Sequence, residues 1–320
     1  MITPYVCKII NISTMKAKII KQLSGLISLI LLYVNHTVVQ AQKIPTDEES
    51  KKIYSAAPDK AAAIPKKERK ILIFTLCRGF YHNSIPYGAK AVQVMGEKTK
   101  AFKSVISDDP SWFEPEKLNE FDGVCLMSAL GEFFIPPDFK QLPQSEQEQI
   151  LKKDKQLKEN FLNFIKGGKG LIVIHGSSYA FPEWKEYPEM LGGFFDRHPW
   201  NGYEKLAIKI EEPSHPLMRA FCPQGFEIID EGYQFKEPYA RKNVRVLMSL
   251  DLSRMETNKP NLRVDRDFPI TWVKQYGKGR VFHCALGHNP EEFWNPSLLT
   301  HILDGIQFAI GDLDAPAEPR

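Results

Sequence analysis

The sequence has few cysteines, and no two of them lie at a spacing typical of metal or redox motifs. Five cysteines occur in 320 residues, and none forms a Cys-x-x-Cys pair. Cys77, Cys125 and Cys284 each lie within an apolar run, where a free cysteine behaves as a small hydrophobic side chain. The pattern fits neither a disulfide framework nor a cysteine metal cluster. We expect the cysteines of the mature chain to be reduced and buried.

The chain lacks an excess of positive charge, except in its N-terminal part. Four of the 42 lysines and arginines, but none of the 39 acidic residues, lie in the first 42 residues. The rest of the chain therefore carries 38 basic and 39 acidic side chains. This balance gives no electrostatic support for binding nucleic acid, and we expect no nucleic-acid partner.

The N-terminal apolar run is too short for a comfortable membrane span. It covers residues 23–34, whereas a spanning helix needs about 20 apolar residues. Basic residues after Met15 precede it, and Val39-Gln40-Ala41 offers a small-residue cleavage site. Residues 1–42 are therefore predicted to be a signal peptide that starts at Met15, with an uncleaved anchor as the alternative. The cleaved protein is expected to be periplasmic, with no membrane span.

The remaining chain is predicted to form one domain between a flexible linker and a short tail. Residues 43–69 are charged, rich in alanine and poor in large apolar side chains, which predicts a flexible linker. We place the folded domain at residues 70–313 and a short tail at residues 314–320. Strand and helix patterns then alternate up to residue 174. The predicted strands are 71–76, 102–107, 123–127 and 171–174, and the predicted helices are 84–99 and 145–166.

This alternation predicts an α/β fold, a three-layer sandwich with helices on both faces of a mostly parallel sheet. After Trp200 the pattern changes to strands without long helices between them. These strands predict additional antiparallel pairing in the C-terminal half, before a closing helix at residues 296–310. They cover residues 204–211, 226–230, 245–250, 270–275 and 280–286.

Histidines and acidic residues follow several of the predicted strands. Open α/β sheets bind their ligands at the carboxyl ends of the strands, so these side chains are expected to meet in one crevice. A single such histidine is more often an ordinary hydrogen-bonded loop residue, but several together favour a shared site. The candidates are His82, His175, His198, His288, Asp230 and Glu231.

Two chemistries stay open for these residues. Imidazoles together with a carboxylate can bind a divalent metal, although no short His-x-x-x-His pair points to one. Alternatively, a histidine beside a carboxylate can act as a general base. A nucleophilic serine or cysteine is disfavoured, because His175 occupies the turn after the strand. Ser177 and Ser178, which come later, are expected to cap the next helix.

Aromatic residues gather near the same strand ends. Aromatic faces beside polar groups suit a sugar, whose C–H faces stack while its hydroxyls form hydrogen bonds. The alternative is that these rings cover the rim of the core. Trp200 and Tyr233 are the aromatic residues expected to bind substrate.

Five motifs, in order, resemble the ThuA-like (trehalose-utilisation) family. The resemblance implies a flavodoxin-like fold of the class I glutamine amidotransferase-like superfamily, and a role in trehalose or 3-keto-glycoside use alongside sugar oxidoreductases. Active members of that superfamily carry a cysteine where this sequence has His175, so glutaminase activity is not expected. The motifs are GFYHNS at 79–84, GKGLIVIHG at 168–176, PEMLGGFFDRHPW at 188–200, DEGY at 230–233, and YGKGRVF at 276–282 leading to LGH at 286–288.

The leading hypothesis is a periplasmic enzyme that cleaves or isomerises a glycoside or keto-sugar by acid–base or metal-assisted chemistry. His175, His288 and Glu231 are its catalytic candidates. The residues expected to bind substrate are His82, His198, Trp200, Tyr233 and Asp230. The rival hypothesis is a non-catalytic carbohydrate-binding protein that serves a partner oxidoreductase.

Overall fold

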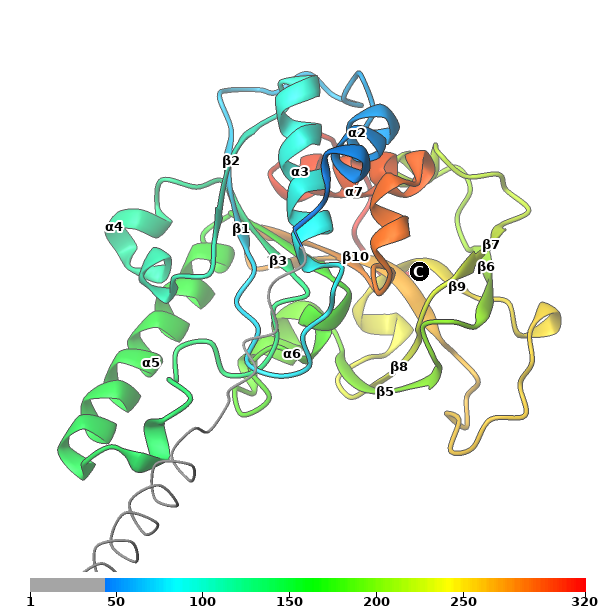
Figure 1. Ribbon diagram of the computed structural model, residues 1–320. Helices are drawn as coiled ribbons and strands as arrows, with labels where there is room; N and C mark the ends of the chain where they lie inside the picture. The colour runs from blue at the N-terminus through cyan, green and yellow to red at the C-terminus, as the bar shows by residue number, and fades with distance from the viewer. Residues whose placement is uncertain (1–43) are drawn as a thin grey trace, which may run out of the picture. The chain divides into compact units, whose positions relative to one another are not determined.

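The computed structural model describes residues 44–320 (Figure 1). The predicted signal peptide, residues 1–42, lies outside the described residues. In the part that is described, none of the helices combines the length and the apolar character needed to cross a membrane.

A nine-stranded mixed sheet forms the centre of the fold, with strand order β2-β1-β3-β4-β11-β10-β9-β6-β7. The first five strands in this order pair in parallel, and the others pair antiparallel. The parallel strands are β1 (Lys70–Phe74), β2 (Lys103–Ser107), β3 (Gly123–Met127), β4 (Gly170–Ile174) and β11 (Gly279–Cys284). The antiparallel strands are β6 (Lys205–Ile210), β7 (Phe226–Ile229), β9 (Arg245–Leu250) and β10 (Pro269–Tyr276).

The predicted α/β class is confirmed, including the antiparallel strands of the C-terminal half. A separate two-stranded sheet pairs β5 (Phe194–Trp200) with β8 (Gly232–Lys236). Neither strand was predicted, because polar and apolar side chains do not alternate regularly along them. Their pairing contains register shifts. These two strands bring His198 and Tyr233 toward the end of the parallel sheet.

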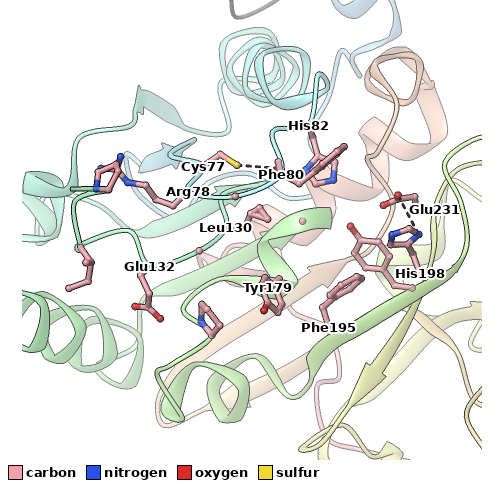
Figure 2. A pocket seen from close by; sticks show the side chains of 17 residues that line it. Cys77, Arg78, Phe80, His82, Leu130, Glu132, Tyr179, Phe195, His198 and Glu231 are labelled. Atoms are coloured by element: carbon pink, nitrogen blue, oxygen red, sulfur yellow. Dashed lines mark hydrogen bonds and ion pairs between the residues drawn. The ribbon is translucent and has the colours of Figure 1, made fainter. Parts of the chain in front are cut away.

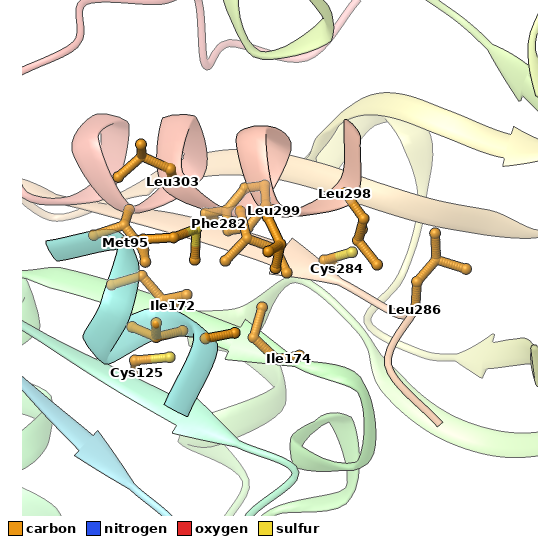
Figure 3. Close-up of a cluster of buried hydrophobic side chains, with 14 of the residues drawn as sticks. Met95, Cys125, Ile172, Ile174, Phe282, Cys284, Leu286, Leu298, Leu299 and Leu303 are labelled. Carbon is orange, nitrogen blue, oxygen red and sulfur yellow. The ribbon is translucent and has the colours of Figure 1, made fainter. Parts of the chain in front are cut away.

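Helices cover both faces of the sheet, and each face has its own apolar core. Because side chains alternate along a strand, Ile172 and Ile174 of β4 face one core while Leu171 and Val173 face the other. Figure 3 shows the first core under α7 (Pro296–Ala309), which also packs near α3 (Ile85–Thr99). The second core lies beneath α5 (Gln144–Lys166), α4 (Pro115–Leu118) and α6 (Glu186–Leu191).

The prediction of a flexible linker at residues 43–69 is wrong. This segment contains α2 (Asp47–Ala56), whose start is fixed by a capping box between Thr46 and Glu49. Ile53 of α2 is fully buried in the first core. Arg69 forms a 2.6 Å ion pair with Asp312. The composition hid this segment because α2 is fixed by a few contacts with distant residues, such as the bonds from Lys98 Nζ to the Tyr54 and Ala57 carbonyls.

The tail at residues 314–320 also packs rather than extending freely. Ala315 and Ala317 pack against the first core, and the Arg245 guanidinium donates to the Glu318 carbonyl at 2.9 Å. Small alanine side chains gave no hydrophobic signal in the sequence, although they fit closely against the existing core surface.

Candidate metal centre

The turn after β4 places His175 at the carboxyl end of the parallel sheet. His175 begins the short 3₁₀ helix η3 (His175–Tyr179) and has φ of 47°, in the left-handed region that non-glycine residues rarely adopt. Such strain persists where the surrounding structure imposes it, and it occurs often at functional sites. The histidine thus stands on a strained strand-to-helix turn of the kind that exposes a nucleophile in other α/β proteins.

Hydrogen bonding defines which nitrogen of His175 carries the proton. Nδ1 lies 2.6 Å from the carbonyl oxygen of Ala285, and a carbonyl can only accept, so Nδ1 donates. In the neutral ring, Nε2 therefore keeps its lone pair. Nε2 lies 2.8 Å from the Tyr233 hydroxyl and 3.4 Å from Oε2 of Glu231. This lone pair is directed at the other site residues.

Four of the predicted residues converge around this nitrogen. His82 follows β1, Glu231 lies between β7 and β8, and His288 follows β11. One ligand atom from each of His82, His175, Glu231 and His288 lies within 4.8 Å of all the others. The ring centres of His82 and His175 are 4.6 Å apart, and His288 Nδ1 lies 3.2 Å from Glu231 Oε2. Their side chains come from four separate segments of the chain.

The charges of this cluster suit a cation. Burial, reinforced by the neighbouring His175 and His288, lowers the pKa of His82 to about 2, so its ring is neutral at physiological pH. Burial alone would raise the pKa of Glu231, but the hydrogen bonds and positive charges that His175 and His288 supply when protonated hold it well below its usual range. Burial likewise disfavours the protonated form of His288, but the hydrogen bond and charge of the neighbouring Glu231 carboxylate raise the pKa of His288 above its ordinary value. The cluster thus offers an ionised carboxylate and, at His82, a neutral imidazole.

The residues fit a divalent metal. Three imidazoles and one carboxylate are the donor set of many zinc and transition-metal sites. Nδ1 of His82 is buried and has no hydrogen-bond partner within residues 44–320, as expected of a group whose partner is a ligand. The bond from His175 Nδ1 to Ala285 is also the outer contact that metal-binding histidines usually have.

Asp230 supports the site from the protein interior and does not line the cavity. Its side chain is fully buried and accepts backbone N–H groups from Glu231 at 2.6 Å, Gly287 at 2.9 Å and His288 at 3.2 Å. The prediction that Asp230 binds substrate is therefore wrong. Its carboxylate instead joins the two loops that carry Glu231 and His288.

Glu292 is a buried acid beside Asp230 that the sequence analysis missed. Burial and the charge of Asp230 raise the pKa of Glu292 well above its ordinary value, so it stays protonated. It caps the 3₁₀ helix η7 (Pro290–Trp294), where its Oε1 accepts the Asn289 N–H at 3.1 Å. The signal available in the sequence was this capping pattern, Asn followed three residues later by Glu.

Trp200 and the two serines do not take the places predicted for them. Trp200 is 1% exposed, packs edge-on against Phe268 and donates its indole N–H to Glu256, so it is no sugar platform. A register shift in β5 turns it into the core. Ser177 and Ser178 lie in η3 and do not cap α6. The Ser178 hydroxyl donates to the His175 carbonyl at 2.7 Å.

A cavity of about 990 Å³ opens beside the metal-binding cluster (Figure 2). His82, Glu231, Tyr233 and His198 line one end of it. His198 is half exposed, and its Nδ1 lies 3.7 Å from Glu231 Oε1. His198 and Tyr233, both predicted to bind substrate, therefore do lie at the cavity.

The loop after β3 forms much of the remaining wall and escaped the sequence analysis. It contributes Leu130, Gly131, Glu132, Ile135 and Pro137 to the cavity. The available signal was the position of this loop, directly after a buried strand. Its mostly apolar residues gave no chemical motif by which it could be recognised.

The four free cysteines of the described chain differ in exposure. Cys125 and Cys284 are buried, as expected, whereas Cys77 is partly buried and Cys222 is exposed. The expectation of burial was therefore wrong for Cys222, which lies in the loop before β7. Cys77 lines the cavity, where burial raises the pKa of its thiol.

Comparison with known proteins defines the class to which this fold and site belong. The family model for ThuA, described as trehalose utilisation, matches residues 70–309. The chain therefore belongs to the ThuA family. No curated protein matches the sequence.

Two solved structures illustrate the similarity. A putative ThuA-like protein from Bacteroides uniformis ATCC 8492 is 20% identical with a TM-score of 0.57, over 78% of this chain and 94% of that one. A putative ThuA-like protein from Parabacteroides merdae ATCC 43184 is 17% identical with a TM-score of 0.49, over 79% of this chain and 98% of that one. The first similarity supports the fold.

Proposed function

We propose that this ThuA family member is a metal-dependent enzyme that cleaves or isomerises a glycoside or keto-sugar. The observation that carries the proposal is the cluster of His82, His175, Glu231 and His288, whose ligand atoms lie within 4.8 Å of one another beside a large cavity. The family description, trehalose utilisation, supports a carbohydrate as the substrate class. The position of His175, where a nucleophile would stand, argues against thiol or serine chemistry.

A divalent cation at this cluster would polarise a substrate oxygen or lower the pKa of a bound water. The chain's own residues would then orient the sugar and donate or transfer protons. Burial, together with the charges of Glu231 and Asp230, raises the pKa of Tyr233 well above 10. Tyr233 therefore keeps its proton, which its hydroxyl donates to Nε2 of His175 at 2.8 Å. With a metal held by that nitrogen, this proton would be free for a hydrogen bond to a substrate oxygen. His198, at the exposed side of Glu231, is placed to exchange a proton with solvent.

Metal content and turnover together test this proposal. Purified protein is expected to contain about one divalent ion per chain, and His175→Ala and Glu231→Gln are expected to lose it, because each removes one of only four ligands. Turnover of a 3-keto-disaccharide should fall by at least about 100-fold in both variants, the scale of a lost catalytic group. Elemental analysis and product chromatography provide the two measurements.

The matched control is His215→Ala, which removes a buried histidine outside the ligand set. It should keep the metal and the activity, provided that circular dichroism shows a folded protein. A folded His175→Ala variant with unchanged turnover would overturn the enzymatic role. Sugar binding without turnover in the metal-loaded wild type would instead favour the binding-protein hypothesis.

We also propose that the protein acts in the periplasm, on substrate supplied by a sugar oxidoreductase. The support is the signal-like pattern of residues 1–42, with basic residues, a short apolar run and Val39-Gln40-Ala41. N-terminal sequencing of the protein released by osmotic shock should begin at Gln42. Recovery of the full-length chain in the membrane fraction would contradict cleavage and support the anchor.

A further inference from the structure

The cavity extends well beyond the metal-binding cluster. Its volume of about 990 Å³ lies at the upper end of the range for small-molecule sites, larger than a single sugar ring requires. In Figure 2, His82, His198 and Glu231 lie at one end, whereas Arg78 and Glu132 lie at the other. A substrate that fills this space must therefore carry a second group besides the sugar that reaches the cluster.

The walls that receive this second group are mainly apolar. We call them the apolar arm and define it by Phe80, Leu130, Ile135, Pro137, Tyr179 and Pro182, all of which line the cavity. Phe80 and Tyr179 are 68% and 40% exposed, so their rings are accessible to a ligand. Apolar and aromatic faces of this kind favour a flat hydrophobic group.

Most of the polar groups around the arm are already hydrogen-bonded to other protein groups. The Arg78 N–H donates to the Leu130 carbonyl at 2.8 Å, and the Phe181 N–H donates to the Gly131 carbonyl at 3.0 Å. The Glu132 carboxylate accepts from Lys158 Nζ at 2.8 Å and from the Glu183 N–H at 2.9 Å. Hydroxyls of a second sugar would give up water here and find few unoccupied partners.

The Arg78 guanidinium and the Tyr179 hydroxyl are the exceptions, since neither has a hydrogen-bond or ion-pair partner within the described residues. A planar guanidinium stacks well on a flat aromatic ring. Its position at the far end of the cavity therefore agrees with the character of the apolar arm.

We propose that the substrate is a glycoside whose aglycone is a flat aromatic group, held in the apolar arm while its sugar reaches the metal-binding cluster. This inference rests on the proposed function and narrows its substrate class. It makes an aryl glycoside a better ligand than trehalose or another disaccharide.

Calorimetric titration of the full, metal-loaded chain with glucosides that differ only in the aglycone tests this inference. The probes are phenyl glucoside, methyl glucoside and a glucosyl-glucose, each as the α and the β anomer. Phenyl glucoside is expected to bind at least about tenfold more tightly than the other two in the preferred anomeric form, a factor that corresponds to about 1.4 kcal/mol. Disaccharide binding as tight as that of phenyl glucoside would overturn the inference.

Two variants of the apolar arm and one control test whether the arm is the source of the preference for phenyl glucoside. Ile135→Asn and Tyr179→Ala should each reduce the preference for phenyl glucoside to less than about threefold and leave the affinity for methyl glucoside unchanged. Tyr179 is partly exposed, so its variant keeps the test valid if Ile135→Asn does not fold. Val264→Asn changes a fully exposed residue outside the cavity and should retain the preference. An undiminished preference in both arm variants would also overturn the inference.

The two proposals fail in distinguishable ways. If the protein binds metal and turns over a disaccharide but shows no preference for an aromatic aglycone, the proposed function stands and the assignment of the apolar arm as an aglycone site is overturned. A protein without metal or turnover that still prefers phenyl glucoside would overturn the enzymatic function and leave the aglycone site in place.

Discussion

The residues of this site depend on the hydrogen bonds that position them as much as on their own chemistry. His175 has a defined tautomer because Ala285 accepts from its Nδ1. Glu231 and His288 meet because Asp230 binds the backbone of both loops. The sequence marked these histidines and acidic residues as candidates, but it could not separate Glu231, which faces the cluster, from its neighbour Asp230, which faces the interior.

Asp230→Asn tests this positioning role. The amide can accept fewer of the three backbone N–H groups and turns a donor toward them, so the loops of Glu231 and His288 should loosen. We expect metal affinity to fall by about 10–100-fold, as for other outer contacts of metal sites. Competition with a metal chelator measures this affinity.

Asp108→Asn is the charge-matched control, because it removes the same charge from an exposed residue, and it should leave metal affinity unchanged. If Asp230→Asn binds metal as tightly as the wild type, Asp230 does not position the ligands. A decrease in thermal stability without any change in metal affinity would show that its role is only structural.

Among the elements, the strands of the parallel sheet were predictable and the peripheral elements were not. β3 matches residues 123–127, because a buried parallel strand is a continuous apolar run. α2 was missed because its composition is charged, and β5 was missed because its polar face borders the site. Elements that depend on tertiary contacts leave little periodicity in the sequence.

Ile53→Ala tests whether α2 is part of the folded domain. Because Ile53 is fully buried in the first core, its truncation should lower the free energy of unfolding by about 2–5 kcal/mol. Ile64→Ala in the same segment is the matched control, since Ile64 is 90% exposed, and should change stability by less than about 0.5 kcal/mol. Urea denaturation measures both variants, and equal stabilities would restore the interpretation of this segment as a linker.

On the scale of the whole molecule, the order of strands creates the site. The parallel strands β1, β3, β4 and β11 are neighbours, so the loops after β1, β4 and β11 converge and bring His82, His175 and His288 together. The second half of the chain then adds Glu231 through the turn between β7 and β8. The cavity exists because the loop after β3 and the strands β5 and β8 build walls around that point.

The sequence alone determined the α/β class, the run of buried strands and the histidines at their ends, because burial and strand length leave local patterns in the chain. His175 was recognisable in this way as the polar residue that ends a buried strand. Only the tertiary structure decided that Trp200 points into the core, that Asp230 supports Glu231, and that an apolar arm extends from the cluster. These outcomes depend on register shifts and on contacts between segments far apart in the chain, which no local pattern records.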